Sequence, residues 1–74
     1  MQQTERETIS LSLNGKATTA AAGTTLGQLL DDLGIVRRMI AVEYNGEILP
    51  RHRYDESTLD DGDQLEVVQM VGGG

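Results

Sequence analysis

The apolar residues at the start of the chain follow a period of two, which predicts a β-hairpin. From Ile9 to Leu13, apolar residues alternate with serines, as in a strand buried on one face. Asn14-Gly15 comes next, a pair favoured in two-residue hairpin turns because both positions tolerate a positive φ. Lys16 to Ala20 is therefore expected to return antiparallel to the first strand, as an edge strand of small residues.

A helix is predicted after Thr25, where the apolar spacing changes. Thr25 and Gln28 match a capping box, in which each side chain bonds the backbone amide of the other residue. Leucines then recur at the three- and four-residue spacing of one helix face: Leu26, Leu29, Leu30 and Leu33. Gly34 is expected to end the helix in the left-handed conformation. A helix this short is marginal by itself, so its leucines should pack on a sheet.

Three further strands are predicted in the second half. Residues 39–44 form the first, with Ile40 and Val42 directed inward, and Asn45-Gly46 turns the chain into a short strand over residues 47–49. Pro50 should end that strand because proline cannot donate to a sheet. Residues 51–58 are expected to be a polar loop with room for one helical turn. A turn at Asp61-Gly62 then leads into a last strand over residues 64–71.

The order of these elements predicts an α+β fold. A helix that crosses one face of a sheet places the first and last strands side by side and parallel. A mixed sheet of four to five strands with one main helix on one face is the ubiquitin-like β-grasp arrangement. We expect a leader without structure over residues 1–8, the β-grasp domain over 9–71 and a flexible glycine tail over 72–74.

Composition narrows the classes of function. Seventy-four residues make one small domain with a thin core. Twelve acidic residues against six basic residues give a net charge of −6, which argues against nucleic acid as a partner. The chain has no cysteine, which fits a reducing compartment, and no apolar run near the ~20 residues of a membrane span. A cytoplasmic protein without membrane contact is expected.

The usual catalytic and metal-binding patterns are not met. The acidic run 60–63 fails as an EF-hand loop, because that register places apolar residues where oxygen ligands are needed. His52 is a single histidine among arginines, and such a residue is more often at the surface than a ligand or base. There is no phosphate-binding P-loop either. The arginines of 37–38 and 51–53 are interpreted as solvated charges, with contacts to acidic residues of a partner as the alternative. We predict no metal and no bound cofactor.

The last strand and its tail are the strongest functional candidates. Leu65 and Val67 share the parity that suits the core, which leaves Val68 and Met70 on the outer face as a candidate docking surface for a partner. Gly72, Gly73 and Gly74 follow, and glycine has the greatest backbone freedom of any residue. Such a tail could enter a narrow channel of a partner. It could also be a frayed end or a cloning remnant.

The carboxylate of Gly74 is the group best suited to covalent chemistry. A carboxylate becomes an acyl donor when one oxygen is made a leaving group, as in an acyl-adenylate. A sulfur nucleophile can then replace that oxygen and leave a thiocarboxylate. Glycine favours this reaction because no Cβ hinders attack at the carbonyl carbon.

Several short motifs in a fixed order resemble the ubiquitin-like sulfur carrier family, and within it the carriers of thiamine biosynthesis. The resemblance covers residues 9–74, and its motifs are Asn14-Gly15, Gly23-Thr24-Thr25, the run from Asn45 to Arg51, Asp61-Gly62-Asp63 and the ending Val71-Gly72-Gly73-Gly74.

This resemblance implies a carrier and not an enzyme. An E1-like adenylyltransferase would consume ATP to adenylate Gly74, and a sulfurtransferase relay would form the thiocarboxylate. Thiazole synthase would then take the sulfur for the thiazole ring of thiamine. The family's partners usually hold the tail and the apolar face of the last strand, which corresponds here to Val68 and Met70.

Three alternatives stay open. The small subunit of molybdopterin synthase shares the fold and the chemistry, but its tail commonly carries prolines, and Gln69-Met70-Val71 has none. A protein modifier would be conjugated to a target lysine through Gly74. A β-grasp interaction module would use no terminal chemistry.

Overall fold

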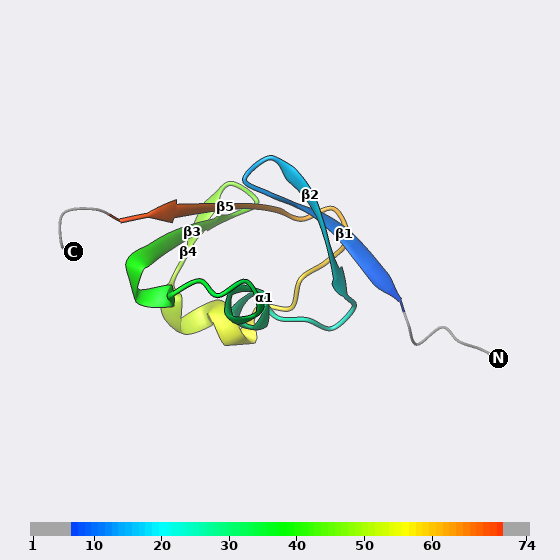
Figure 1. The fold of residues 1–74 in the computed structure, drawn as a ribbon, viewed down its shortest axis with the longest axis horizontal. Coiled ribbons are helices and arrows are strands. Elements are labelled where there is room, and N and C mark those ends of the chain that lie inside the picture. Colours follow the sequence, from blue (N-terminus) through cyan, green and yellow to red (C-terminus); the bar gives the residue numbers. More distant parts are fainter. Residues whose placement is uncertain (1–6, 71–74) are drawn as a thin grey trace.

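In the described part of the chain, a five-stranded mixed sheet forms one layer, and one α-helix packs across one of its faces (Figure 1). The computed structural model describes residues 7–70. The elements in chain order are β1 (Thr8–Leu13), β2 (Lys16–Ala21), α1 (Leu26–Asp32), the 3₁₀ turn η2 (Arg37–Met39), β3 (Ile40–Tyr44), β4 (Glu47–Leu49), the 3₁₀ helix η3 (Arg51–Glu56) and β5 (Gln64–Gln69).

The strand order β2-β1-β5-β3-β4 confirms the predicted β-grasp topology. β1 and β5 are parallel neighbours, paired at Ser12–Gln64 and Leu13–Leu65, whereas the other neighbours are antiparallel. β2 is an edge strand, as expected, and β4 is the other edge. The last strand of the chain therefore lies in the middle of the sheet.

Strand ends differ from the predictions by one or two residues. β1 begins at Thr8, one residue early, because the Ala22 amide donates to the Glu7 carbonyl and extends the hairpin. β2 continues to Ala21, and β5 ends at Gln69 instead of residue 71. Residues 1–6 of the leader predicted over 1–8, and the whole tail predicted over 72–74, lie outside the described residues, whereas Thr8 belongs to β1.

The helix is capped at both ends as the sequence indicates. The Gln28 amide donates to Thr25 Oγ1 at 3.1 Å, and the Thr25 amide donates to Gln28 Oε1 at 3.4 Å, which completes the capping box. Gly34 has φ 75°, and its amide bonds the carbonyl of Asp31 while the Ile35 amide bonds that of Leu30. These two bonds are those of a Schellman motif.

One leucine of the predicted stripe does not belong to the core. Leu26, Leu29 and Leu30 are buried, but Leu33 is 48% exposed. Leu33 is the C-cap residue, so the helix ends before its side chain can reach the sheet. The core is otherwise formed by apolar residues from every layer: Leu11, Leu26, Leu29, Leu30, Ile40, Val42, Tyr54, Leu59 and Leu65.

The helical turn allowed for in the predicted polar loop over residues 51–58 is present, but the expectation that this segment is polar throughout was wrong. Residues 51–56 form η3, and Tyr54 within it is only 1% exposed. The following segment bonds the start of α1, because the Leu26 amide donates to the Ser57 carbonyl and the Leu59 amide to the Thr24 carbonyl. These bonds draw the 51–59 segment under the helix and bury Tyr54 and Leu59 in the core.

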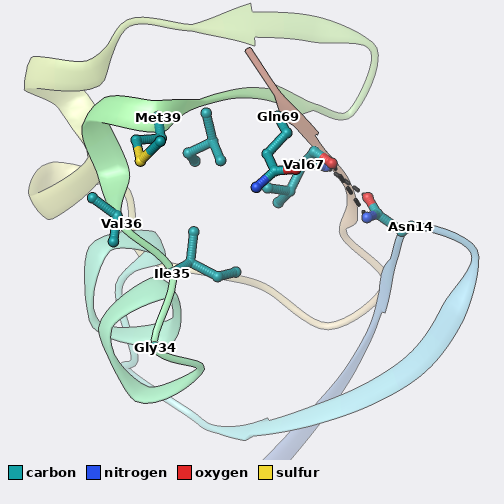
Figure 2. A pocket seen from close by; sticks show the side chains of 8 residues that line it. Asn14, Gly34, Ile35, Val36, Met39, Val67 and Gln69 are labelled. Atoms are coloured by element: carbon teal, nitrogen blue, oxygen red, sulfur yellow. Dashed lines mark hydrogen bonds between the residues drawn. The ribbon is translucent and has the colours of Figure 1, made fainter. Parts of the chain in front are cut away.

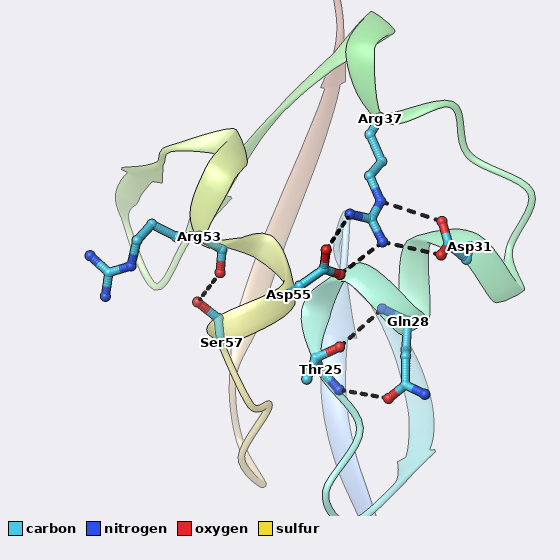
Figure 3. Close-up of polar contacts among 7 residues, drawn as sticks. All are labelled: Thr25, Gln28, Asp31, Arg37, Arg53, Asp55 and Ser57. Carbon is cyan, nitrogen blue, oxygen red and sulfur yellow. Dashed lines mark hydrogen bonds and ion pairs between the residues drawn. The ribbon is translucent and has the colours of Figure 1, made fainter.

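Arg37 is not a solvated charge, which corrects the sequence-based interpretation. Its guanidinium donates to Asp31 of α1 and to Asp55 of η3, with Nη2–O distances of 3.1 and 3.0 Å (Figure 3). The hydrogen bonds from Arg37 hold the pKa of Asp55 below its usual range. A Cβ at Gly27 would collide with the Asp55 carboxylate, so glycine at this position lets the ion-pair cluster lie against the helix.

Candidate functional site

β5 is the last strand and runs to one end of the molecule (Figure 1). It leaves the sheet at the end of the molecule opposite to the end where β1 begins (Figure 1). β1 pairs only with the first part of β5, so the second part is held on one side by β3, from Tyr44–Leu65 to Ile40–Gln69. The Met70 amide adds one further bond, to the Met39 carbonyl at 2.9 Å. The backbone is therefore fixed as far as Met70, which we call the tail root.

The orientation of β5 agrees with the parity expected from the sequence. Leu65 is 1% exposed and Val67 packs half-buried against the core. Val68 and Met70 are 55% and 41% exposed. Their role in docking stays a prediction, and Gly72, Gly73 and Gly74 lie outside the described residues.

The outer face around Val68 combines apolar and acidic side chains. Val68 lies opposite Ala41 on β3, and two residues along the strands, on the same face, Glu66 lies opposite Glu43. Glu43 in turn lies opposite Ile48 of β4, which is 64% exposed. Directly opposed carboxylates repel each other weakly, so the pairing itself gains nothing from this arrangement.

A pocket that the sequence did not predict opens on the other face of the sheet, beside the tail root (Figure 2). It has a volume of about 560 Å³ and is lined by Asn14, Gly34, Ile35, Val36, Met39, Ile40, Val67 and Gln69. None of these side chains titrates, so the pocket offers apolar contact and two amides, and lacks a general acid or base. It lies where the Gly34 turn leads the chain away from α1, a tertiary feature without a local sequence signal.

The two Asn-Gly turns brace β5 from both sides. Asn14 and Asn45 each have φ 52°, and each directs its side chain at the β5 backbone. Asn14 bonds both the amide and the carbonyl of Val67, and the Gln64 amide donates to Asn45 Oδ1 at 2.7 Å. The turns were predicted from the Asn-Gly pairs, but this second role of the asparagine side chains has no local pattern in the sequence.

Asp63 is the buried polar residue of the turn before β5. Its carboxylate accepts hydrogen bonds from Tyr44 Oη at 2.6 Å, from the Asp60 amide at 2.7 Å and from Asn45 Nδ2 at 3.1 Å. Burial raises the pKa of Asp63, but these three hydrogen bonds outweigh it and hold the pKa below its usual range. Burial, followed by the bond to Asp63, raises the pKa of Tyr44 to about 12. This network fixes the start of β5, and the polar groups of Tyr44, Asn45 and Asp63 are hydrogen-bonded within it.

The acidic run 60–63 and His52, the other two candidates from the sequence, do not form a catalytic or metal-binding site in the described part of the chain. The Asp61 carboxylate accepts the Ser10 amide at 2.8 Å, which makes the acidic run part of a structural turn. His52 is exposed on η3. Within residues 7–70, no three His, Cys, Asp or Glu residues lie close enough together to hold a metal ion. No helix of the described part is long and apolar enough to cross a membrane.

Comparison with known proteins connects this geometry to one family. Residues 5–74 match the ThiS family. The chain is 40% identical to the sulfur carrier protein ThiS of Bacillus subtilis over 65 residues, which cover 86% of this chain and 98% of that protein. It is 32% identical to the sulfur carrier protein ThiS of Escherichia coli over 66 residues, which cover 89% of this chain and 100% of that one.

A longer class of relatives also contains a similar segment. The chain is 41% identical over 66 residues to a thiazole synthase of Paramagnetospirillum magneticum; the match covers 89% of this chain but spans only 20% of that protein. Among solved structures, the crystal structure of the thiamine biosynthesis protein (ThiS) from Geobacter metallireducens superposes with a TM-score of 0.78 at 36% identity, over 89% of this chain and all of that one.

Proposed function

The chain belongs to the ThiS family, and we propose on that basis that it is a sulfur carrier of thiamine biosynthesis whose C-terminal glycine holds the sulfur as a thiocarboxylate. The single observation that carries the proposal is the combination of a rigid tail root with a Gly-Gly-Gly ending. Met70 is fixed to β3, and residues 71–74 extend beyond it by up to about 13–14 Å if fully extended.

The chemistry proceeds in two steps. A carboxylate oxygen of Gly74 attacks the α-phosphate of ATP on an E1-like adenylyltransferase, and pyrophosphate leaves. In the second step, the terminal sulfur of a persulfide on a sulfurtransferase relay attacks the carbonyl carbon, and the C–O bond to AMP breaks. A thiol of the relay then cleaves the S–S bond of the acyl disulfide, which leaves the thiocarboxylate on Gly74 and a disulfide on the relay. Within residues 7–70, Tyr44 and Asp63 are bonded to each other at the start of β5 and do not serve as acid or base in either step. The partners therefore provide the catalysis.

Thiazole synthase is the proposed acceptor of the sulfur. A segment similar to this chain occurs within proteins named thiazole synthase, which supports a close working relation between carrier and synthase. The family match likewise favours the thiamine role over molybdopterin synthesis, protein conjugation and a purely structural interaction module.

The outer face of β5 is proposed to meet the partner beside the tail. Val68 and Met70 are exposed, and both precede the glycines by only a few residues. Methionine adapts to more than one partner surface, which suits a carrier that visits several enzymes in turn.

Pyrophosphate exchange with the E1-like enzyme and ATP tests the activation step. The protein ending at Gly74 should support exchange, and a variant that lacks Gly73 and Gly74 should not, because a reactive centre tolerates errors of only about 1 Å. A variant with one residue added after Gly74 should also fail. Exchange by the shortened variant would show that another group is adenylated.

A second set of variants tests the docking face. Val68→Glu and Met70→Glu should weaken binding to the activating enzyme without loss of stability, because both side chains lie outside the core. Leu33→Glu is the matched control, since Leu33 is about as exposed but lies at the end of α1 on the other side of the sheet. Equal binding by all three variants would place the docking face elsewhere.

A further inference from the structure

The basic residues of this acidic protein are not equally available to a partner. Two of those in the described part are neutralised: Arg37 by Asp31 and Asp55, and Arg53 by Glu56 at 3.3 Å. Within residues 7–70, three basic side chains have no carboxylate within ion-pair distance: Lys16, Arg38 and Arg51.

Two of these three, Arg38 and Arg51, belong to segments that meet beside the tail root. Arg51 Nη2 donates to the Arg38 carbonyl at 3.4 Å, which holds the guanidinium against η2. The next carbonyl along the chain, that of Met39, accepts the Met70 amide at 2.9 Å. The consecutive carbonyls of Arg38 and Met39 thus accept hydrogen bonds from the Arg51 side chain and from the Met70 amide. We call Arg38 and Arg51 the tail-root arginines.

On the rest of the described surface, acidic side chains outnumber basic ones. The outer face presents Glu43 and Glu66, and the turn before β5 adds Asp60 and Asp61, while the whole chain carries −6. Because Arg38 and Arg51 have no carboxylate partner within residues 7–70 and belong to segments beside Met70, acidic groups on a partner surface would be attracted to this part of the molecule.

We propose that the tail-root arginines bind carboxylate side chains at the mouth of the enzyme site that receives the tail, a step that rests on the proposed carrier function. The surface of the partner that surrounds its tail channel would carry Asp or Glu opposite Arg38 and Arg51. The contact orients the carrier tail-first and adds affinity. Its strength falls as salt screens the charges.

The position of the arginines separates this role from catalysis. Residues 71–74 span up to about 13–14 Å, so a carboxyl group at Gly74 in an extended tail reacts well away from the tail root. Loss of the arginines should therefore raise the KM for the carrier and leave kcat nearly unchanged. If the arginines instead held the phosphates of ATP, their loss would raise the KM for ATP.

Charge-reversal variants test the inference in the pyrophosphate-exchange reaction. Arg38→Glu with Arg51→Glu should raise the KM for the carrier by on the order of tenfold at low salt, with the difference shrinking as salt rises. Lys16→Glu is the control, because it makes the same charge change per residue at the β1–β2 turn and should have a much smaller effect. Arg38→Lys with Arg51→Lys keeps the charge and should keep most of the affinity.

The outcomes distinguish this inference from the function on which it rests. A wild-type protein that supports no exchange would overturn both. Suppose that the wild-type protein supports exchange, but that the double arginine variant has the same KM for the carrier as Lys16→Glu. That result would overturn the arginine contact and leave the carrier function standing. A raised KM for ATP, or a fall in kcat at unchanged KM, would also overturn it. Urea unfolding of each variant shows whether the exposed substitutions have left the fold intact.

Discussion

The side chain of Asn14 bonds both backbone groups of Val67: the Val67 amide donates to Oδ1 at 2.6 Å, and Nδ2 donates to the Val67 carbonyl at 3.2 Å. The Asn14 amide itself donates to the Leu65 carbonyl at 2.8 Å. Since β1 pairs with β5 at only two residues, the asparagine side chain continues the pairing after β1 has turned away into β2. One turn residue thus braces the strand that leads to the tail.

Replacement of Asn14 should therefore destabilise the protein more than loss of a surface side chain does. Asn14→Ala removes both side-chain bonds and places a Cβ residue without a polar group at φ 52°, so the free energy of unfolding should fall by about 2–3 kcal/mol. Asn14→Gly loses the bonds but accepts the backbone angle, and should cost only about 1–2 kcal/mol. Urea unfolding measures both values. An Asn14→Ala protein as stable as wild type would contradict the bracing role.

Tyr54 is the second residue whose importance only the structure reveals. It is 1% exposed within η3, so Tyr54→Ala should lower the free energy of unfolding by about 3–5 kcal/mol. His52→Ala, two residues earlier on the exposed side of the same turn, should change it by less than about 0.5 kcal/mol. Thermal or urea unfolding compares the pair. Similar stability of the two variants would mean that η3 is not part of the core.

The sequence predicted the features that depend on local patterns. Alternation, capping residues and Asn-Gly pairs were sufficient for the strands, the helix and their order, and strand parity placed Val68 outside and Leu65 inside. Burial of Tyr54 was missed because it depends on bonds between residues 57–59 and the start of α1, which no local pattern encodes.

Contacts between distant side chains were missed for the same reason. Arg37 meets Asp31 and Asp55 because the Gly34 turn brings η2 back over α1. The spacing of charged residues along the chain does not predict how the backbone turns after the helix. The pocket beside Met39 likewise arises from packing between segments.

Acid should weaken the turn before β5. The pKa of Asp63 in the folded protein lies below its usual value, so Asp63 stabilises the fold above an unfolded-state pKa of about 3.9 and loses this contribution as the pH falls through the lower, folded-state pKa. Asp63→Asn should cost about 1–3 kcal/mol at pH 7 and should flatten the dependence of stability on pH below about 4.

Asp32→Asn is the matched control for this pH experiment, since Asp32 is exposed at the end of α1. It should leave stability at pH 7 and the acid dependence close to those of wild type. Urea unfolding between pH 3 and 7 makes the comparison. An Asp63→Asn protein with the full acid dependence of wild type would assign that dependence to other carboxylates.

The intact mass of the protein after incubation with its activating enzyme, ATP and a sulfur donor tests the central claim most directly. The mass should rise by the difference between one sulfur and one oxygen atom, and fragmentation should confine the change to the peptide ending at Gly74. Omission of ATP should prevent the change, because the carboxylate then has no leaving group. A mass that stays constant with a partner shown to be competent, or a sulfur found on another part of the chain, would contradict the carrier role of Gly74.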